Sequence, residues 1–128
     1  TDPSEAAQFA RETGVDAMAI SVGNVHLQQD HEGGLDEDRI RAIEAVTEVP
    51  LVIHGGSGVP LPQRRALAHG SRICKFNIGT ELRMVFGATL RKVLAEDADR
   101  FDRVQILDPL EAPIMEAARE VLRNIGPR

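Results

Sequence analysis

A histidine, three glycines and a serine follow directly on a short apolar segment in residues 51–58. The apolar segment predicts a buried strand, which would hold His54 rigidly at its carboxyl end. Gly55 and Gly56 lack side chains, so their backbone amides, beside the Ser57 hydroxyl, could approach an anion closely. An imidazole next to such a loop indicates a metal ligand beside a phosphate site. A plain chain reversal with a hydrogen-bonded structural histidine explains the same residues, because glycine-rich motifs carry little information alone.

Polar residues follow two other apolar segments in a similar way. The segment 16–22 leads to His26, and the segment 72–78 carries Asn77 near its end and continues to Thr80. Strand patterns alternate with helix patterns, which predicts an α/β fold with a parallel sheet and helical crossovers. The three polar clusters would then share the carboxyl edge of the sheet, where (β/α)8 barrels build their active sites.

Capping residues and apolar periodicity locate the helices that separate and follow these strands. The expected helices cover about residues 3–13, 35–46, 60–69, 81–96 and 110–124. The fourth of them has a wide apolar face that includes Phe86 and Val93. Asp108 is expected to cap the last helix, with Pro109 at its first position.

Composition excludes several classes of protein. The chain has 128 residues, a formal net charge of −5 and neither Trp nor Tyr, which argues against a nucleic-acid partner. No apolar run approaches the roughly 20 residues of a membrane span, and no signal-peptide pattern opens the chain, so we expect a cytoplasmic protein without a membrane partner. The single cysteine, Cys74, lies in an apolar strand pattern and is expected to be a buried, inert thiol.

The three clusters, taken in order, resemble the C-terminal half of the zinc-dependent class II ketose-bisphosphate aldolases. That family has His-Gly-Gly-Ser-Gly after one strand and Asn-x-x-Thr-Glu/Asp-Leu-Arg/Lys after the next, which residues 54–58 and 77–83 match. Thr-Asp-Pro-x-x-Ala at 1–6 and Gly-Val-Asp-Ala-x-Ala at 14–19 are also similar. The resemblance implies strands six to eight of a (β/α)8 barrel. Residues 1–128 would form one unit, the C-terminal half of that barrel with a final helix at 110–124.

The resemblance assigns a metal site to two histidines of this chain. His26 and His54 match two of the three family histidines that bind Zn2+, or another divalent metal ion, which acts as a Lewis acid on an enediolate. The third ligand and the acid/base carboxylates would lie before Thr1, so the chain should be inactive without the N-terminal half of the barrel. The remaining histidines, His31 and His69, are interpreted as structural.

The resemblance also implies a site for the phosphate of a ketose. The backbone of Gly55, Gly56 and Ser57 would hold it together with the stretch Asn77, Ile78, Gly79 and Thr80. Asn77 would also position substrate near the metal ion, although a helix-capping role remains an alternative. Leu27 stands where the family usually has a glycine that binds phosphate and a monovalent cation, Na+ or K+. Lys75 should share the barrel interior with Asn77, where it contacts substrate or fills a polar layer.

These implications define the expected function. The parent enzyme would reversibly cleave fructose or tagatose 1,6-bisphosphate into dihydroxyacetone phosphate and glyceraldehyde 3-phosphate, a lyase reaction of glycolysis and carbohydrate metabolism. The complete protein would be a homo-oligomer. Two other hypotheses stay open: a noncatalytic, phosphate-binding half-barrel subunit, and a related barrel lyase that uses a different aldehyde.

Overall fold

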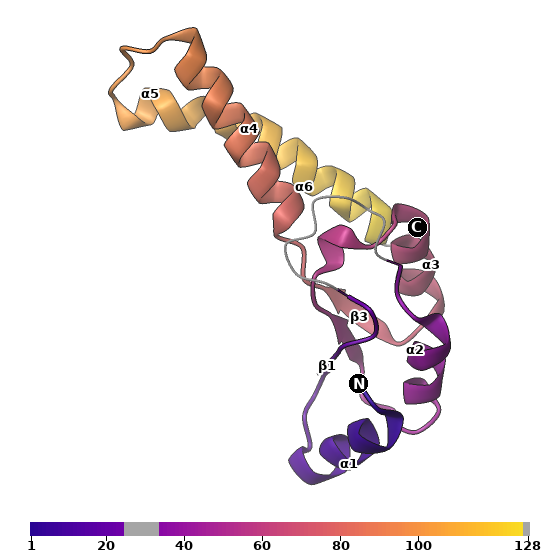
Figure 1. The fold of residues 1–128 in the computed structure, drawn as a ribbon. Coiled ribbons are helices and arrows are strands. Elements are labelled where there is room, and N and C mark those ends of the chain that lie inside the picture. Colours follow the sequence, from indigo (N-terminus) through magenta and orange to yellow (C-terminus); the bar gives the residue numbers. More distant parts are fainter. Residues whose placement is uncertain (25–33, 127–128) are drawn as a thin grey trace.

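The computed structural model describes residues 1–24 and 34–126, and it contains a small parallel sheet with helices around it (Figure 1). In chain order the elements are α1 (Pro3–Thr13), β1 (Met18–Ile20), α2 (Glu37–Glu44), β2 (Leu51–Ile53), the 3₁₀ turn η1 (Gly56–Gly58), α3 (Leu61–Gly70), β3 (Ile73–Phe76), α4 (Thr80–Glu96), α5 (Arg103–Leu107), the 3₁₀ turn η2 (Asp108–Leu110) and α6 (Glu111–Ile125). The strands pair in the order β1-β2-β3, and both pairings are parallel. The predicted α/β class and its alternating order are therefore confirmed.

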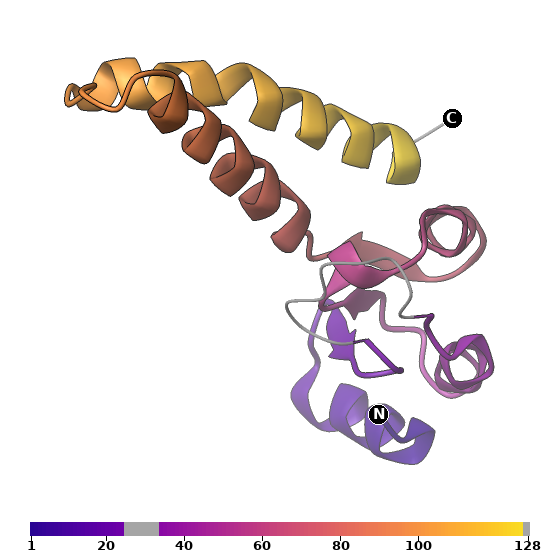
Figure 2. The same ribbon diagram turned by 45° about the horizontal axis from the view of Figure 1, so that its top comes forward.

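One face of the sheet packs against α2 and α3, which lie along the same side of the strands (Figure 2). Ile20 of β1 and Ile53 of β2 are partners in the register and are buried with Ile40 and Ile43 of α2. Along β1, Ala19 points the other way and is exposed. The described residues therefore cover only one face of this strand.

The first helix begins and ends as its sequence predicts. The Asp2 carboxylate accepts hydrogen bonds from the backbone N–H groups of Ser4, at 2.8 Å, and Glu5, at 3.2 Å. Together with the Ser4 hydroxyl, which has the largest effect, these donors hold the pKa of Asp2 below its ordinary value. Gly14 has a φ of 64° and donates its N–H to the Ala10 carbonyl, which closes the last turn.

Residues 80–125 form a helical hairpin that extends away from the sheet (Figure 1). Helices α4 and α6 lie beside each other and run in opposite directions, and α5 and η2 connect them at the end far from the sheet. The wide apolar face predicted for α4 is only partly covered: Val93 is buried, whereas Phe86 is 40% exposed. No helix in the described ranges is long and apolar enough to cross a membrane.

One local prediction for this part of the chain is wrong, and one helix in it was not predicted. Asp108 does not cap the final helix but opens η2, and α6 begins at Glu111 without a side-chain cap. The capping aspartate of this region is Asp102, whose carboxylate accepts from the backbone amides of Val104 and Gln105 and starts the short helix α5. Helix α5 was not expected from the sequence.

Cys74 is exposed, so the prediction of a buried thiol is also wrong. The register explains the difference, because Leu51 pairs with Ile73 whereas the next residue, Val52, pairs with Lys75. Cys74 is therefore an extra residue of β3, and such a bulge turns a side chain out of the regular alternation. Its thiol donates to the Leu51 carbonyl at 3.4 Å.

Candidate functional site

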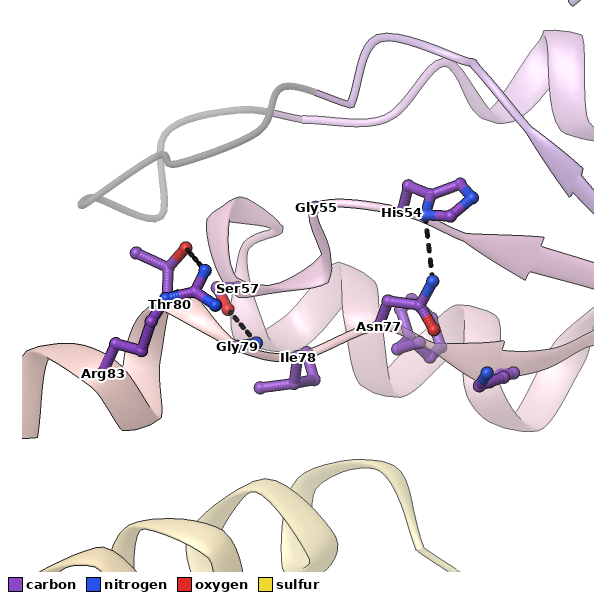
Figure 3. A pocket seen from close by; sticks show the side chains of 10 residues that line it. His54, Gly55, Ser57, Asn77, Ile78, Gly79, Thr80 and Arg83 are labelled. Atoms are coloured by element: carbon purple, nitrogen blue, oxygen red, sulfur yellow. Dashed lines mark hydrogen bonds between the residues drawn. The ribbon is translucent and has the colours of Figure 1, made fainter. Parts of the chain in front are cut away.

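The carboxyl ends of β2 and β3 open onto a cavity of about 430 Å³, next to the first turn of α4 (Figure 3). Most of its lining comes from the two polar segments that the sequence analysis singled out. The lining residues are His54, Gly55, Ser57, Lys75, Phe76, Asn77, Ile78, Gly79, Thr80 and Arg83. The structure thus brings together the predicted residues of 54–57 and 77–80, apart from Gly56, which is buried and does not line the cavity.

His54 lies exposed at the end of β2, and polar contacts fix its position. Its ring Nδ1 is 2.9 Å from the amide Nδ2 of Asn77, at the end of β3. Its backbone carbonyl accepts from Asn24 Nδ2 at 3.0 Å, and Asn24 Oδ1 accepts in turn from the Val22 amide at 2.7 Å. The imidazole is therefore oriented by one asparagine, while another asparagine ties its backbone to the end of β1.

The glycine-rich loop packs tightly against the segment that follows β3. Gly55 adopts the left-handed conformation, with a φ of 63°, and lets the chain enter η1. Gly56 donates its N–H to the Asn77 carbonyl at 3.1 Å, and a Cβ at Gly56 would lie 2.9 Å from Ile78 Cδ1. The Gly56 amide is thus engaged within the protein, and the missing side chain of Gly56 allows the two segments to approach each other.

Ser57 connects the same loop to the first turn of α4. Its side chain is buried, with 4% of the residue exposed, and Oγ accepts from the backbone amides of Gly79, at 3.2 Å, and Glu81, at 3.3 Å. The first amides of a helix lack partners within the helix, and here a hydroxyl from another segment supplies one. The positive end of the α4 dipole therefore faces this edge of the cavity, which favours a bound anion there.

Two cationic side chains line the cavity, and neither was expected at the phosphate site from the sequence. Arg83 folds back along the first turn of α4, so that Nη2 lies 3.4 Å from Thr80 Oγ1 (Figure 3). Lys75, on β3, lines the same cavity as Asn77, as their alternation along the strand predicts. Arg83 could have been found from its spacing, because a residue three positions after Thr80 lies one helical turn further on.

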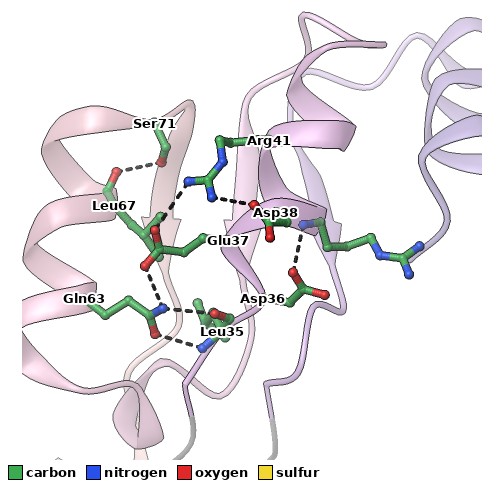
Figure 4. A network of polar contacts seen from close by, with 9 residues as sticks. Leu35, Asp36, Glu37, Asp38, Arg41, Gln63, Leu67 and Ser71 are labelled. Carbon is green, nitrogen blue, oxygen red and sulfur yellow. Dashed lines mark hydrogen bonds and ion pairs between the residues drawn. The ribbon is translucent and has the colours of Figure 1, made fainter.

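The predicted residues His26 and Leu27 lie outside the described residues, and so does His31. The structure does describe how α2 is anchored after this segment. Gln63 of α3 accepts from the Leu35 amide at 2.8 Å and donates to the Leu35 carbonyl and to Glu37 Oε1, both at 2.9 Å (Figure 4). The start of α2 is therefore fixed to the helix that follows the glycine-rich loop. His69 is exposed on α3 and does not line the cavity.

The family model for class II fructose-bisphosphate aldolases matches residues 1–128, the whole chain. The chain belongs to the class II fructose-bisphosphate aldolase family. The chain is similar to the YdjI aldolase from Escherichia coli K12, with 28% identity and a TM-score of 0.76. It also has the fold of a protein from Coccidioides immitis assigned as a fructose-1,6-bisphosphate aldolase, with 22% identity and a TM-score of 0.70.

The alignments cover 98% of the aldolase chain but 44% of YdjI and 42% of the Coccidioides immitis protein, so this chain spans less than half of either. Its parallel sheet and helices are consistent with part of a (β/α)8 barrel. The resemblance found in the sequence is thereby confirmed.

The family is generally zinc-dependent, and the described residues fit such a site in part. They contain no group of three or more His, Cys, Asp or Glu side chains placed to hold a metal ion. His54 does offer an exposed imidazole at the cavity, with its ring held by Asn77. Rotation of the Asn77 amide would let Oδ1 accept from Nδ1–H, which is the tautomer whose Nε2 carries the lone pair that a metal ion binds. Further ligands have to come from beyond the described residues, since a catalytic zinc usually has three protein ligands.

Proposed function

We propose that this chain forms the ketose-phosphate half of a class II aldolase active site. The enzyme would reversibly cleave fructose or tagatose 1,6-bisphosphate into dihydroxyacetone phosphate and glyceraldehyde 3-phosphate. One observation carries the proposal: the His54 imidazole and the N-terminus of α4 open onto the same cavity. The proposed metal ligand and the proposed anion site would therefore both be within reach of a single small substrate.

The phosphate site would lie between the glycine-rich loop and α4. Ser57 and Thr80 contribute hydroxyl groups, and Arg83 contributes a positive charge next to Thr80. The backbone of Gly55, Ile78 and Gly79 completes the site that the family resemblance implies. The resemblance also includes Gly56, whose amide binds the Asn77 carbonyl here and would support the loop rather than contact the phosphate. Leu27 and a monovalent cation, Na+ or K+, belong to the same proposal. Since a phosphate is a dianion, the guanidinium and the helix dipole act in the same direction on it.

The metal site would consist of His54, His26 and a third ligand from another part of the complete protein. Bound Zn2+, or another divalent ion, would supply positive charge that stabilises negative charge on the ketose oxygen. Asn77 orients the His54 ring and lies where it could also contact substrate. The described lining of the cavity includes no carboxylate, so the acid/base groups for proton transfer would also come from elsewhere.

The proposal extends to the architecture of the complete protein. Residues 1–128 would contribute strands six to eight of the barrel, and an N-terminal half would supply the others. The coverage of 44% of YdjI supports such a second part. The chain on its own would then be inactive, and the complete protein would be a homo-oligomer with a sugar bisphosphate as its substrate.

The test is His54→Ala in the complete protein, with His69→Ala as the matched control. We expect His54→Ala to abolish tight zinc binding and ketose-bisphosphate cleavage together, because the imidazole contributes to both. His69 is exposed and outside the cavity, so its replacement should change neither. Retention of zinc and activity in His54→Ala would overturn the ligand assignment. Failure of the unaltered protein to cleave any ketose bisphosphate would overturn the proposed reaction.

A further inference from the structure

Among the described residues, Arg64 is the only charged residue that the fold buries, with 1% of its surface exposed. It lies on α3, on the same face as the core residue Leu67. Burying a guanidinium is unfavourable unless its N–H groups have partners. The position of those partners indicates what this arginine does.

Three hydrogen bonds of Arg64 reach three different segments of the chain. Its Nη1 donates to the Gly56 carbonyl in the glycine-rich loop at 3.3 Å and to Glu81 Oε1 in the first turn of α4 at 2.5 Å. Its Nε donates to Asn124 Oδ1 in the last turn of α6 at 2.7 Å. The guanidinium is planar and rigid, so it fixes the separation of the groups that it joins.

The first two partners belong to the two walls of the proposed phosphate site. Glu81 is held twice, since Arg64 binds its carboxylate and the Ser57 hydroxyl accepts from its backbone amide at 3.3 Å. Gly56 is held by Arg64 through its carbonyl and by the Asn77 carbonyl through its amide. The spacing between the loop and the first turn of α4 therefore depends on Arg64.

The third partner connects this arrangement to the C-terminal helix. Asn124 accepts from Arg64 and also donates from Nδ2 to the Leu61 carbonyl, at 3.1 Å, where α3 begins. The Asn124 side chain makes both contacts and so attaches the end of α6 to α3. A change in the last turn of α6 would be transmitted to Arg64, although α6 does not line the cavity.

We propose that Arg64 is a positioning residue of the phosphate site, and that the last turn of α6 holds it in place through Asn124. This inference rests on the proposed function, because it concerns the same phosphate site. Arg64 does not contact the ligand; it sets the distance between the Ser57 loop and the N-terminus of α4. Buried ion pairs often add little stability but can specify one geometry, which is the role assigned here.

Asn124→Leu in the complete protein tests the proposal, because it removes the Arg64 contact at a distance from the cavity. We expect the KM for the ketose bisphosphate to rise roughly three- to tenfold, as for a partly lost hydrogen bond to a charged group. The kcat should stay within about twofold, since a phosphate contact acts on substrate and transition state alike. Arg123→Ala, which removes exposed ion pairs to Glu116 and Glu120 in the same part of α6, should leave KM unchanged.

A second measurement separates this inference from the proposed function. Binding of inorganic phosphate, followed by calorimetry on the same variants, requires no turnover and should weaken three- to tenfold in Asn124→Leu. Asn124→Leu with a lowered melting temperature but unchanged KM and phosphate affinity would overturn the positioning role. If the unaltered protein binds phosphate but cleaves no ketose bisphosphate, the proposed reaction is wrong. The effect of Asn124→Leu on phosphate affinity would then decide the positioning role of Arg64.

Discussion

Asn77 Nδ2 lies 2.9 Å from His54 Nδ1, so that side chains at the ends of neighbouring strands contact each other beside the cavity. A histidine that binds a metal ion through one ring nitrogen usually has the other nitrogen held by a hydrogen bond, which fixes the ring and its tautomer. Asn77 is therefore a candidate for this orienting role. Its position at the cavity is compatible with a contact to substrate as well.

Replacing Asn77 by alanine should weaken metal binding without removing a ligand. We expect zinc affinity to fall about 10- to 100-fold, the usual effect of losing a group that orients a metal-bound histidine. Competition with a zinc chelator in the complete protein measures this. Asn24→Ala is the matched control, because Asn24 binds the backbone carbonyl of His54 and not its ring. An equal loss in both variants would contradict a specific effect on the ring.

Replacing Ser57 by alanine should affect both phosphate binding and stability. The hydroxyl is a candidate donor to phosphate, so its loss should cost about 1.5–3 kcal/mol of binding and raise KM correspondingly. It also accepts from the Gly79 and Glu81 amides, and leaving these without a partner should lower the free energy of unfolding by about 1–3 kcal/mol. Steady-state kinetics and urea denaturation of the complete protein measure the two effects.

Ser71→Ala provides the comparison for this prediction. The Ser71 hydroxyl donates to the Leu67 carbonyl at the end of α3 at 2.6 Å and does not line the cavity. Its loss should lower stability and leave KM as it was. A KM that stays constant in Ser57→Ala as well would remove Ser57 from the phosphate site.

The sequence predicts the parts of this fold that depend on local chemistry. Apolar runs followed by glycine or asparagine correctly locate the three strands and the edge at which His54 and Asn77 meet. Asp2 with Pro3 and a left-handed Gly14 define α1 for the same reason, since caps act within one turn.

Features that depend on contacts between distant segments were not predicted. The bulge at Cys74 arises from the pairing of two strands, which the apolar pattern of β3 alone does not contain. A single arginine in a short helix is normally solvated. The hydrogen-bond partners that make burial of Arg64 possible lie 8, 17 and 60 residues away in the sequence. The helix α5 has five residues, too few for apolar periodicity to distinguish it from a loop.

Gly56→Ala tests whether the close approach of the glycine-rich loop to the segment after β3 shapes the site. An added Cβ would lie 2.9 Å from Ile78 Cδ1, 3.2 Å from Phe76 Cβ and 3.3 Å from the Asn77 carbonyl oxygen, so backbone as well as side chains would have to move. We expect a loss of about 1–3 kcal/mol in the free energy of unfolding, as for other overpacked sites. The displaced loop should also raise KM, because it carries Ser57.

The matched control for Gly56→Ala is Gly70→Ala, at the end of α3. A Cβ at Gly70 would meet nothing within 4 Å, so this variant should be as stable as the unaltered protein, or more stable by up to about 1 kcal/mol. Thermal and urea denaturation of the complete protein compare the two. Equal stability and equal KM for both variants would show that the loop can move away from Ile78 without consequence. The phosphate site would then not depend on this contact, and its geometry would have to be set by Arg64 and Ser57 instead.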